Sequence, residues 1–100
     1  MKVCVAGLGA VGGLVAARLA LAGHEVSALA RGATLAAVRE RGLALTTSQG
    51  ERRVARIEAA GSAAELRVPE LLIVAAKGAA FAADAKQLAP LIGPRTIVLP

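Results

Sequence analysis

The sequence of 100 residues has almost no aromatic side chains: it contains one Phe and no Trp or Tyr. Proteins that bind single-stranded nucleic acids stack the bases on aromatic rings, so this lack argues against such a function. Twelve Lys and Arg exceed seven Asp and Glu, but the cations are spread from Lys2 to Arg95, and the tightest group is Arg52, Arg53 and Arg56. Dispersed cations are typical of a solvated surface. We therefore predict no nucleic-acid partner and expect the positive charge to favour a small anionic ligand.

Cysteine and long apolar runs are also scarce. Cys4 is the single cysteine and cannot form an internal disulfide, which agrees with a reducing, cytoplasmic compartment. The 56% hydrophobic content includes 25 Ala, which contribute little area each. Residues 3–26 resemble a signal peptide or a membrane span in outline, but Arg18, His24 and Glu25 interrupt the run of about 20 apolar residues that a span needs. We predict no membrane segment.

Glycine, in contrast, is placed where a nucleotide-binding sheet needs it. Lys2–Ala6 is a short, mostly β-branched apolar run, and G-L-G-A-V-G (residues 7–12) separates this predicted strand from a predicted helix that ends at Gly23. This position gives an otherwise weak motif its meaning. Gly7 would permit the tight turn, Gly9 would let a pyrophosphate approach the backbone, and Gly12 would let helix and strand pack closely.

The predicted anion site consists of the N–H groups at the start of this helix, so it also includes Leu8, Ala10 and Val11. The alternative is a glycine turn without a ligand. We expect the helix to turn one apolar stripe toward the sheet. The residues of this stripe are Val11, Leu14, Val15, Arg18 and Leu19.

The second predicted strand, Glu25 to Leu29, is not followed by an acidic residue. An acid about 20 residues after the glycines usually binds the adenosine ribose, whereas an arginine suits a ribose that carries a 2′-phosphate. Arg31 lies 19 residues after Gly12, and its planar guanidinium can grip a phosphate and stack on adenine. This favours NADP(H) over NAD(H). The alternative is an exposed arginine at the end of a strand.

The rest of the sequence predicts a single α/β domain over residues 1–100. The expected elements are a helix capped by Thr34 and ended by Gly42, a hairpin of Leu43–Thr47 and Arg52–Glu58, a helical turn at Ser62–Leu66, a strand at Leu71–Ala76, a helix from about Ala79 to Ala89, and a strand at Thr96–Leu99. The fold class is therefore α/β, a Rossmann-like, doubly wound, mainly parallel sheet with a small inserted antiparallel hairpin.

Lys77 follows the predicted strand Leu71–Ala76 and precedes the next predicted helix, where the helix dipole disfavours a cation. Ligands of open α/β sheets lie outside the carboxyl ends of strands, so Lys77 could contact a cofactor phosphate or an anionic substrate. The equally open alternative is that its long stem carries the charge into water. We predict no metal site.

These segments together resemble the amino-terminal domain of the ketopantoate reductase (2-dehydropantoate 2-reductase) family. The resemblance covers nearly the whole chain and is carried, in this order, by G-L-G-A-V-G, A-G-H-E-V, L-A-R-G, the hairpin around Gln49-Gly50, L-L-I-V-A-A-K-G and T-I-V-L-P. It implies NADPH-dependent reduction of the ketone of 2-dehydropantoate to (R)-pantoate, on the route to pantothenate and coenzyme A. It assigns Gly7, Gly9 and Gly12 to the phosphate loop, Arg31 to the 2′-phosphate and Lys77 to a place beside the cofactor.

The sequence departs from the family pattern at two places. Gly78, Ala79 and Ala80 follow Lys77 where the family often has Ala and then an aromatic or polar residue, and Glu70 stands where Asp is common. The resemblance also implies a Gln-Asn-Gly segment after Pro100 and a helical second domain with a catalytic lysine and a substrate-binding acid. We therefore expect the chain to be a fragment that contains no catalytic residue, binds NADPH only weakly and does not reduce ketopantoate.

Two other functions remain open. The first is another NADP-dependent dehydrogenase of 2-keto or 3-hydroxy acids, such as a relative of the β-hydroxyacid or glycerol phosphate dehydrogenases. The second is a non-catalytic dinucleotide-binding module. The oligomeric state, a homo-oligomer included, is open as well.

Overall fold

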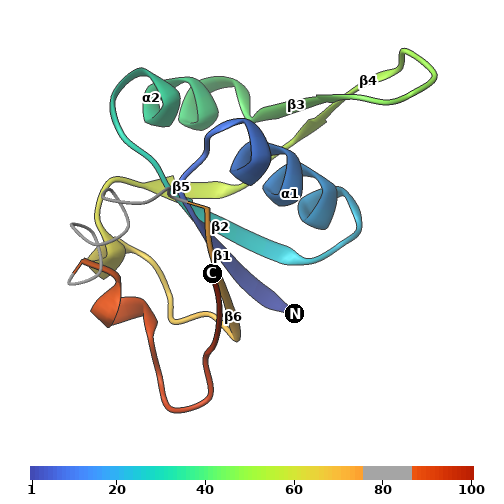
Figure 1. Ribbon diagram of the computed structural model, residues 1–100. Helices are drawn as coiled ribbons and strands as arrows, with labels where there is room; N and C mark the ends of the chain where they lie inside the picture. Colours follow the sequence, from blue (N-terminus) through green and yellow to red (C-terminus); the bar gives the residue numbers. More distant parts are fainter. Residues whose placement is uncertain (76–86) are drawn as a thin grey trace.

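Within residues 1–75 and 87–100, which the computed structural model describes, five parallel strands form the main sheet (Figure 1). The strands are β1 (Lys2–Ala6), β2 (Glu25–Leu29), β5 (Glu58–Ala60), β6 (Leu71–Val74) and β7 (Ile97–Leu99). Their order is β5-β2-β1-β6-β7, and every neighbouring pair is parallel. The chain runs from β1 to one edge of the sheet and then returns to the other side of β1. This confirms the predicted doubly wound, Rossmann-like fold.

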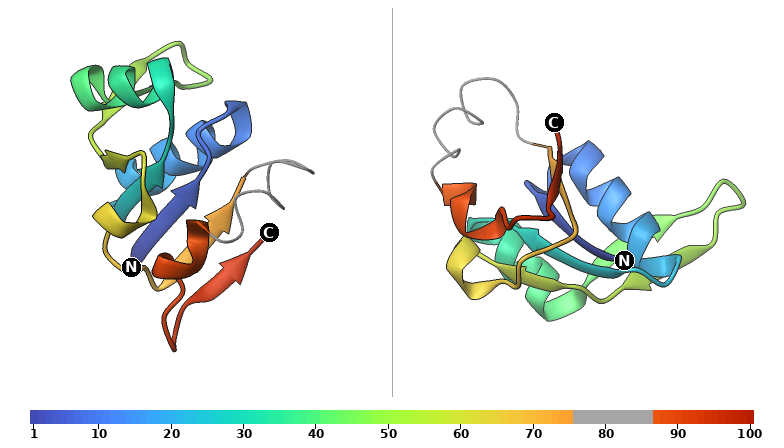
Figure 2. Two further views of the ribbon diagram at one scale, coloured as in Figure 1. Left: turned by 90° about the vertical axis from the view of Figure 1, so that its left-hand side faces the viewer. Right: turned by 90° about the horizontal axis from the view of Figure 1, so that it is seen from below.

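The two faces of the sheet pack against different elements (Figure 2). Val3 and Val5 of β1 pack with Ala16 of helix α1 (Ala10–Leu21). Cys4, from the alternate face of β1, packs with residues of the short helices η1 (Ala63–Glu65) and η2 (Ala89–Leu91). A sheet covered on both faces explains the continuous apolar runs in its strands. None of the helices in the described ranges is both long and apolar enough to cross a membrane.

The buried face of α1 differs from the predicted one. Val11 and Leu14 were expected to face the sheet, but their side chains are 66% and 44% exposed, and Arg18 is exposed too. Gly12 and Ala16 are buried, and of the predicted stripe Leu19 packs against the core while Val15 is half-buried. The prediction was wrong for Val11, Leu14 and Arg18. It ranked helix faces by apolar area, whereas the first turns of the helix pack through their smallest residues, which allow the closest approach of the backbone to the sheet.

The predicted hairpin is confirmed, but its second strand is shorter than expected. Strand β3 (Leu43–Thr46) pairs antiparallel with β4 (Arg52–Ala55), and the hairpin extends away from the main sheet (Figures 1 and 2). The last residues of the expected strand, up to Glu58, do not belong to the hairpin. The chain crosses to the main sheet, where β5 pairs in parallel with β2.

Helix α2 (Gly32–Arg41) begins two residues before the predicted cap at Thr34. Arg31, and not Thr34, is the residue that precedes the helix, and its side chain makes no capping hydrogen bond. The chain turns immediately after β2 because Gly32 adopts φ 59°, a left-handed conformation that glycine takes at little cost. The start of α2 therefore lies close to the carboxyl end of β2.

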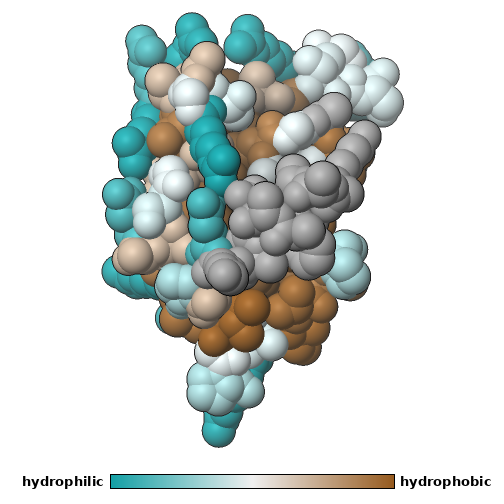
Figure 3. Space-filling model, turned by 60° about the vertical axis from the view of Figure 1, so that its left-hand side comes forward, coloured by the Kyte–Doolittle hydropathy of each residue, from teal (hydrophilic) through white to brown (hydrophobic). Residues whose placement is uncertain are grey.

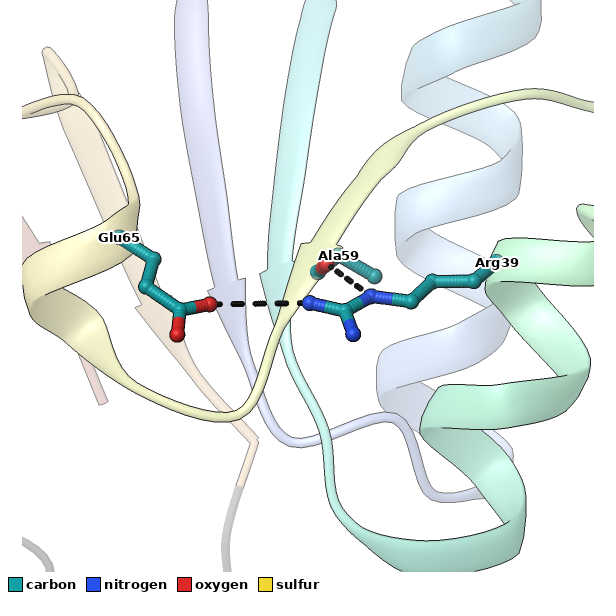
Figure 4. Close-up of polar contacts among 3 residues, drawn as sticks. All are labelled: Arg39, Ala59 and Glu65. Carbon is teal, nitrogen blue, oxygen red and sulfur yellow. Dashed lines mark hydrogen bonds and ion pairs between the residues drawn. The ribbon is translucent and has the colours of Figure 1, made fainter.

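Arg39 links helix α2, to which it belongs, to strand β5 and to the short helix η1 (Figure 4). Its Nε donates a hydrogen bond of 3.0 Å to the carbonyl oxygen of Ala59 on the edge strand β5, and its Nη2 lies 3.6 Å from Oε2 of Glu65 in η1. Because both charged side chains are more than half exposed, the ion pair adds little. The bond to Ala59 satisfies one carbonyl of a sheet edge.

The other predicted elements agree in position where they are described. The helical turn after Ser62 is η1, and the strand predicted at Leu71–Ala76 is β6, which ends at Val74. The helix expected from about Ala79 to Ala89 lies mostly outside the described residues, and Gln87 is the first residue described after the gap.

Strand β7 forms the other edge of the described sheet and begins one residue later than predicted. All three of its side chains are exposed, as is Ile92 before it. Figure 3 shows apolar surface in the lower half of the molecule, above a hydrophilic tip. The core is therefore concentrated around β1, β2 and β6, whose carboxyl ends form the candidate site.

Candidate functional site

A cleft with a volume of about 310 Å³ lies at the carboxyl ends of β1, β2 and β6. Gly7, Leu8 and Gly9 line it from the turn after β1, and Arg31 lines it from the segment after β2. The apolar side chain of Leu88 contributes to it from the far side. Its volume is at the lower end of the range for small-molecule sites. The sheet order changes direction between β1 and β6, and such switch points are where open α/β sheets bind ligands.

The turn between β1 and α1 lines this cleft with Gly7, Leu8 and Gly9. Gly7 adopts φ 102°, and its N–H donates to the carbonyl oxygen of Leu29 at 3.0 Å, so the turn is fixed to the end of β2. The first hydrogen bond of α1 runs from the Gly13 N–H to the Gly9 carbonyl oxygen at 2.8 Å, and no side chain caps the helix. The N–H groups that precede Gly13 thus have no acceptor within the helix.

The space beside these N–H groups is open. A Cβ atom placed on Gly9 would meet no heavy atom within 4 Å. An uncapped helix start with its positive dipole end facing open space is suited to an anion such as a diphosphate. The residues present therefore fit the pyrophosphate of a dinucleotide.

Gly12 lies behind the turn and brings α1 against it. A Cβ atom on Gly12 would lie 2.1 Å from the Gly7 carbonyl oxygen and 3.0 Å from Cβ of Ala75. These distances agree with the close packing predicted for this glycine. Gly12 thus sets where the helix starts, and with it the position of the free N–H groups.

Arg31 provides the positive charge at the cleft. Its side chain is exposed, and its Nη2 donates a hydrogen bond of 2.8 Å to Oε1 of Gln87. None of the described residues that line the cleft is acidic. A guanidinium is suited to bind a phosphate in two places.

The predicted site residues differ in where the structure places them. Gly7, Leu8, Gly9 and Arg31 line the cleft, and Gly12 supports the turn from behind. Ala10 begins α1, and the side chain of Val11 is 66% exposed and does not line the cleft, so Val11 could serve an anion there only through its backbone N–H. Lys77 lies outside the described residues. In the described part of the chain, no three His, Cys, Asp or Glu side chains gather as a metal site would require.

The model of the ketopantoate reductase family PanE/ApbA matches residues 3–100. The chain belongs to the ketopantoate reductase family. Among curated proteins, a 2-dehydropantoate 2-reductase from Mesorhizobium japonicum (strain LMG 29417 / CECT 9101 / MAFF 303099) is 40% identical over 100 residues, which are 99% of this chain and 30% of that protein. The chain thus spans about 30% of the length of the curated relative it matches.

Solved structures agree with the family assignment. A Ralstonia solanacearum MolK2 protein described as a ketopantoate reductase is 46% identical and superposes with a TM-score of 0.91 over 97% of this chain and 30% of its own. The 2-dehydropantoate 2-reductase from Porphyromonas gingivalis W83 is 33% identical, with a TM-score of 0.89 over 100% of this chain and 37% of its own.

Thr34, Gly61 and Gln87 are among the residues on the cleft of this ketopantoate reductase family member that sequence reasoning missed. Thr34 was interpreted as a helix cap, although its position three residues after Arg31 could have placed it beside the phosphate site once the early start of α2 was recognised. No local pattern marks Gly61 or Gln87. Gly61 reaches the cleft because it follows β5, which pairs with β2, and Gln87 reaches it from the residues before η2, where it is hydrogen-bonded to Arg31.

Proposed function

We propose that this chain binds NADPH in the cleft at the carboxyl ends of β1, β2 and β6, as the cofactor-binding part of a 2-dehydropantoate 2-reductase. The observation that carries the proposal is the pairing of an uncapped, open helix start at Gly9 with a guanidinium, Arg31, on the same cleft. One feature suits the pyrophosphate and the other suits the 2′-phosphate.

The cofactor, when bound, supplies the hydride, and the protein supplies the binding and the orientation. The N–H groups at the start of α1 would hold the pyrophosphate, which is possible because Gly12 lets the helix start against the turn. Arg31 would hold the 2′-phosphate through charge-assisted hydrogen bonds. The formal net charge of +5 favours the approach of a polyanionic dinucleotide.

The choice between NADPH and NADH rests on residue 31. D-Mandelate dehydrogenase, whose solved structure contains NADH, shares the fold at 24% identity with a TM-score of 0.84. The fold alone therefore does not select the cofactor. A carboxylate at the end of β2 would repel a 2′-phosphate, and this chain has Arg31 there instead.

The experiment is a calorimetric titration with NADPH and NADH on the protein and on Arg31→Ala. Losing charge-assisted hydrogen bonds of about 1.5–3 kcal/mol should weaken NADPH binding roughly 10- to 100-fold and leave NADH binding nearly unchanged. Arg41→Ala is the matched control, because it removes the same charge from the opposite end of α2. Equal affinity of the unmutated protein for the two cofactors would refute the assignment.

We propose 2-dehydropantoate as the substrate of the whole enzyme and (R)-pantoate, a precursor of pantothenate and coenzyme A, as its product, by analogy with the curated relative. Reduction of a ketone needs a donor that stabilises the developing oxyanion. Arg31 is the only ionisable residue among the described residues of the cleft, and it lies at the proposed adenosine end. We therefore expect these 100 residues to bind NADPH without reducing 2-dehydropantoate. Turnover by this chain alone would contradict that expectation.

A second candidate is a dinucleotide-binding module without catalysis. It is favoured by the same shortage of ionisable groups in the described cleft. One measurement distinguishes the two candidates. The protein as it occurs in the cell is mixed with NADPH and 2-dehydropantoate, and oxidation of the NADPH would support the reductase and exclude the non-catalytic module.

A further inference from the structure

Gln87 contacts the residue on which cofactor choice depends. Its Oε1 accepts the hydrogen bond of 2.8 Å from Nη2 of Arg31, although 56 residues separate the two along the chain. Both side chains line the cleft. The bond therefore joins the segment after β2 to the segment that leads into η2.

The backbone at Gln87 is held in place by its neighbour. Leu88 is 5% exposed and packs in the core cluster with Ala6 and Val74, which are the last residues of β1 and β6. These strand ends also line the cleft. Gln87 thus presents its amide from a point fixed to the sheet, so its hydrogen bond restricts where the Arg31 guanidinium can lie.

Such a restriction matters for a flexible side chain. An arginine loses rotational freedom when it grips a ligand, and a side chain that is ordered before the ligand arrives loses less on binding. A guanidinium has five N–H donors, so a bond to Gln87 is compatible with a bidentate grip on a phosphate. The Gln87 amide is neutral and does not repel a phosphate as a carboxylate would.

We propose that Gln87 is a positioning residue for cofactor selectivity: it holds the Arg31 guanidinium at the cleft in the orientation that receives a 2′-phosphate. The proposal rests on the proposed function, in which Arg31 selects NADPH. It predicts that the preference for NADPH over NADH depends on both residues together.

A double-mutant cycle tests the proposal. Dissociation constants for NADPH and NADH are measured by calorimetry for the protein, Gln87→Ala, Arg31→Ala and the double variant. Gln87→Ala should weaken NADPH binding roughly three- to tenfold, the range expected for one side chain that must be ordered on binding, and leave NADH binding within roughly twofold. In the Arg31→Ala background the same substitution should have no effect on the ratio of the two constants.

Two further variants sharpen the result. Gln87→Glu keeps an acceptor for Arg31 but adds a negative charge, so it should reduce the NADPH preference more than Gln87→Ala does. Gln49→Ala, in the turn of the β3–β4 hairpin, is the matched control and should leave both constants unchanged.

The remaining outcomes overturn the proposal in distinguishable ways. Tighter NADPH binding by Gln87→Ala would mean that the amide competes with the phosphate, and equal weakening of both cofactors would mean that Gln87 has a structural role only. If Arg31→Ala keeps the NADPH preference, the proposed function fails at Arg31, and the positioning role fails with it.

Discussion

Replacement of Gly12 by alanine tests how closely α1 must approach the turn after β1. The added Cβ would lie 2.1 Å from the Gly7 carbonyl oxygen and 3.0 Å from Cβ of Ala75. Nonbonded heavy atoms prefer separations of about 3.5–4.0 Å, and the Gly7 oxygen belongs to the backbone, so α1 must move. Overpacking costs about 1–3 kcal/mol, and this overlap belongs at the upper end. Alanine's better helix propensity offsets about 1 kcal/mol, which leaves an expected net loss of about 2 kcal/mol.

The matched control is Gly13→Ala, one position along the same helix. Its added Cβ has one neighbour within 4 Å, the Leu8 carbonyl oxygen at 3.9 Å, so only the gain in helix propensity of about 1 kcal/mol remains. The two variants should thus differ by about 3 kcal/mol in free energy of unfolding. For a chain of this length that corresponds to roughly 12–24 °C in Tm.

Thermal and urea unfolding followed by far-ultraviolet circular dichroism measure this difference, because the chain has no Trp or Tyr to report by fluorescence. Equal stability of Gly12→Ala and Gly13→Ala would refute the close approach of α1. Calorimetry on the same proteins adds a second readout: Gly12→Ala should lose NADPH binding even at temperatures where it remains folded, and Gly13→Ala should retain it.

Three further predictions concern other parts of the domain. Gly9→Ala places its Cβ in open space, so it should change the free energy of unfolding by less than about 1 kcal/mol. The same variant should weaken NADPH binding at least roughly tenfold, and an unchanged affinity would contradict the phosphate site. Thr96→Val removes a hydroxyl that accepts from the Gly93 N–H at 2.9 Å and donates to the Pro69 oxygen at 2.8 Å, and should lower stability in urea by about 1–3 kcal/mol, with Thr96→Ser nearly unchanged. Burial raises the pKa of the Cys4 thiol, so the free energy of unfolding should fall as the pH rises above about 8.5, where the thiol of the unfolded chain ionises. Cys4→Ala should flatten this pH dependence, and an unaltered slope in that variant would contradict the prediction.

The strand, the glycine turn and the helix at the start of the chain could be predicted because their signals are local. Lys2–Ala6 is a strand with the predicted bounds, and Gly7 makes the turn that the motif requires. Arg31 could be located for the same reason, since it follows a short apolar strand at a known distance from the glycines. These parts of the site depend on residues close to one another in sequence.

Strand β5 could not be predicted, because its three residues, Glu58–Ala60, show no alternation and few large apolar side chains. They form a strand because β2 offers a free edge to pair with. Gln87 was missed for a related reason: its role depends on a contact across the fold with Arg31, and nothing in its local sequence indicates that contact. Long-range pairing decides both cases.

The orientation of α1 shows that the geometry of a site can outweigh the burial of large apolar side chains. Burial of Val11 and Leu14 would contribute roughly 1.5–3 kcal/mol each, yet both remain largely exposed. Gly12 is the residue that allows the helix to start against the Gly7 carbonyl, and once Gly12 lies inward, helical geometry also turns Ala16 inward and Val11 outward. The same approach places the uncapped start of α1 directly after the Gly7–Gly9 turn that lines the cleft. The position of the helix start, and not the size of its apolar residues, therefore determines which face packs on the sheet.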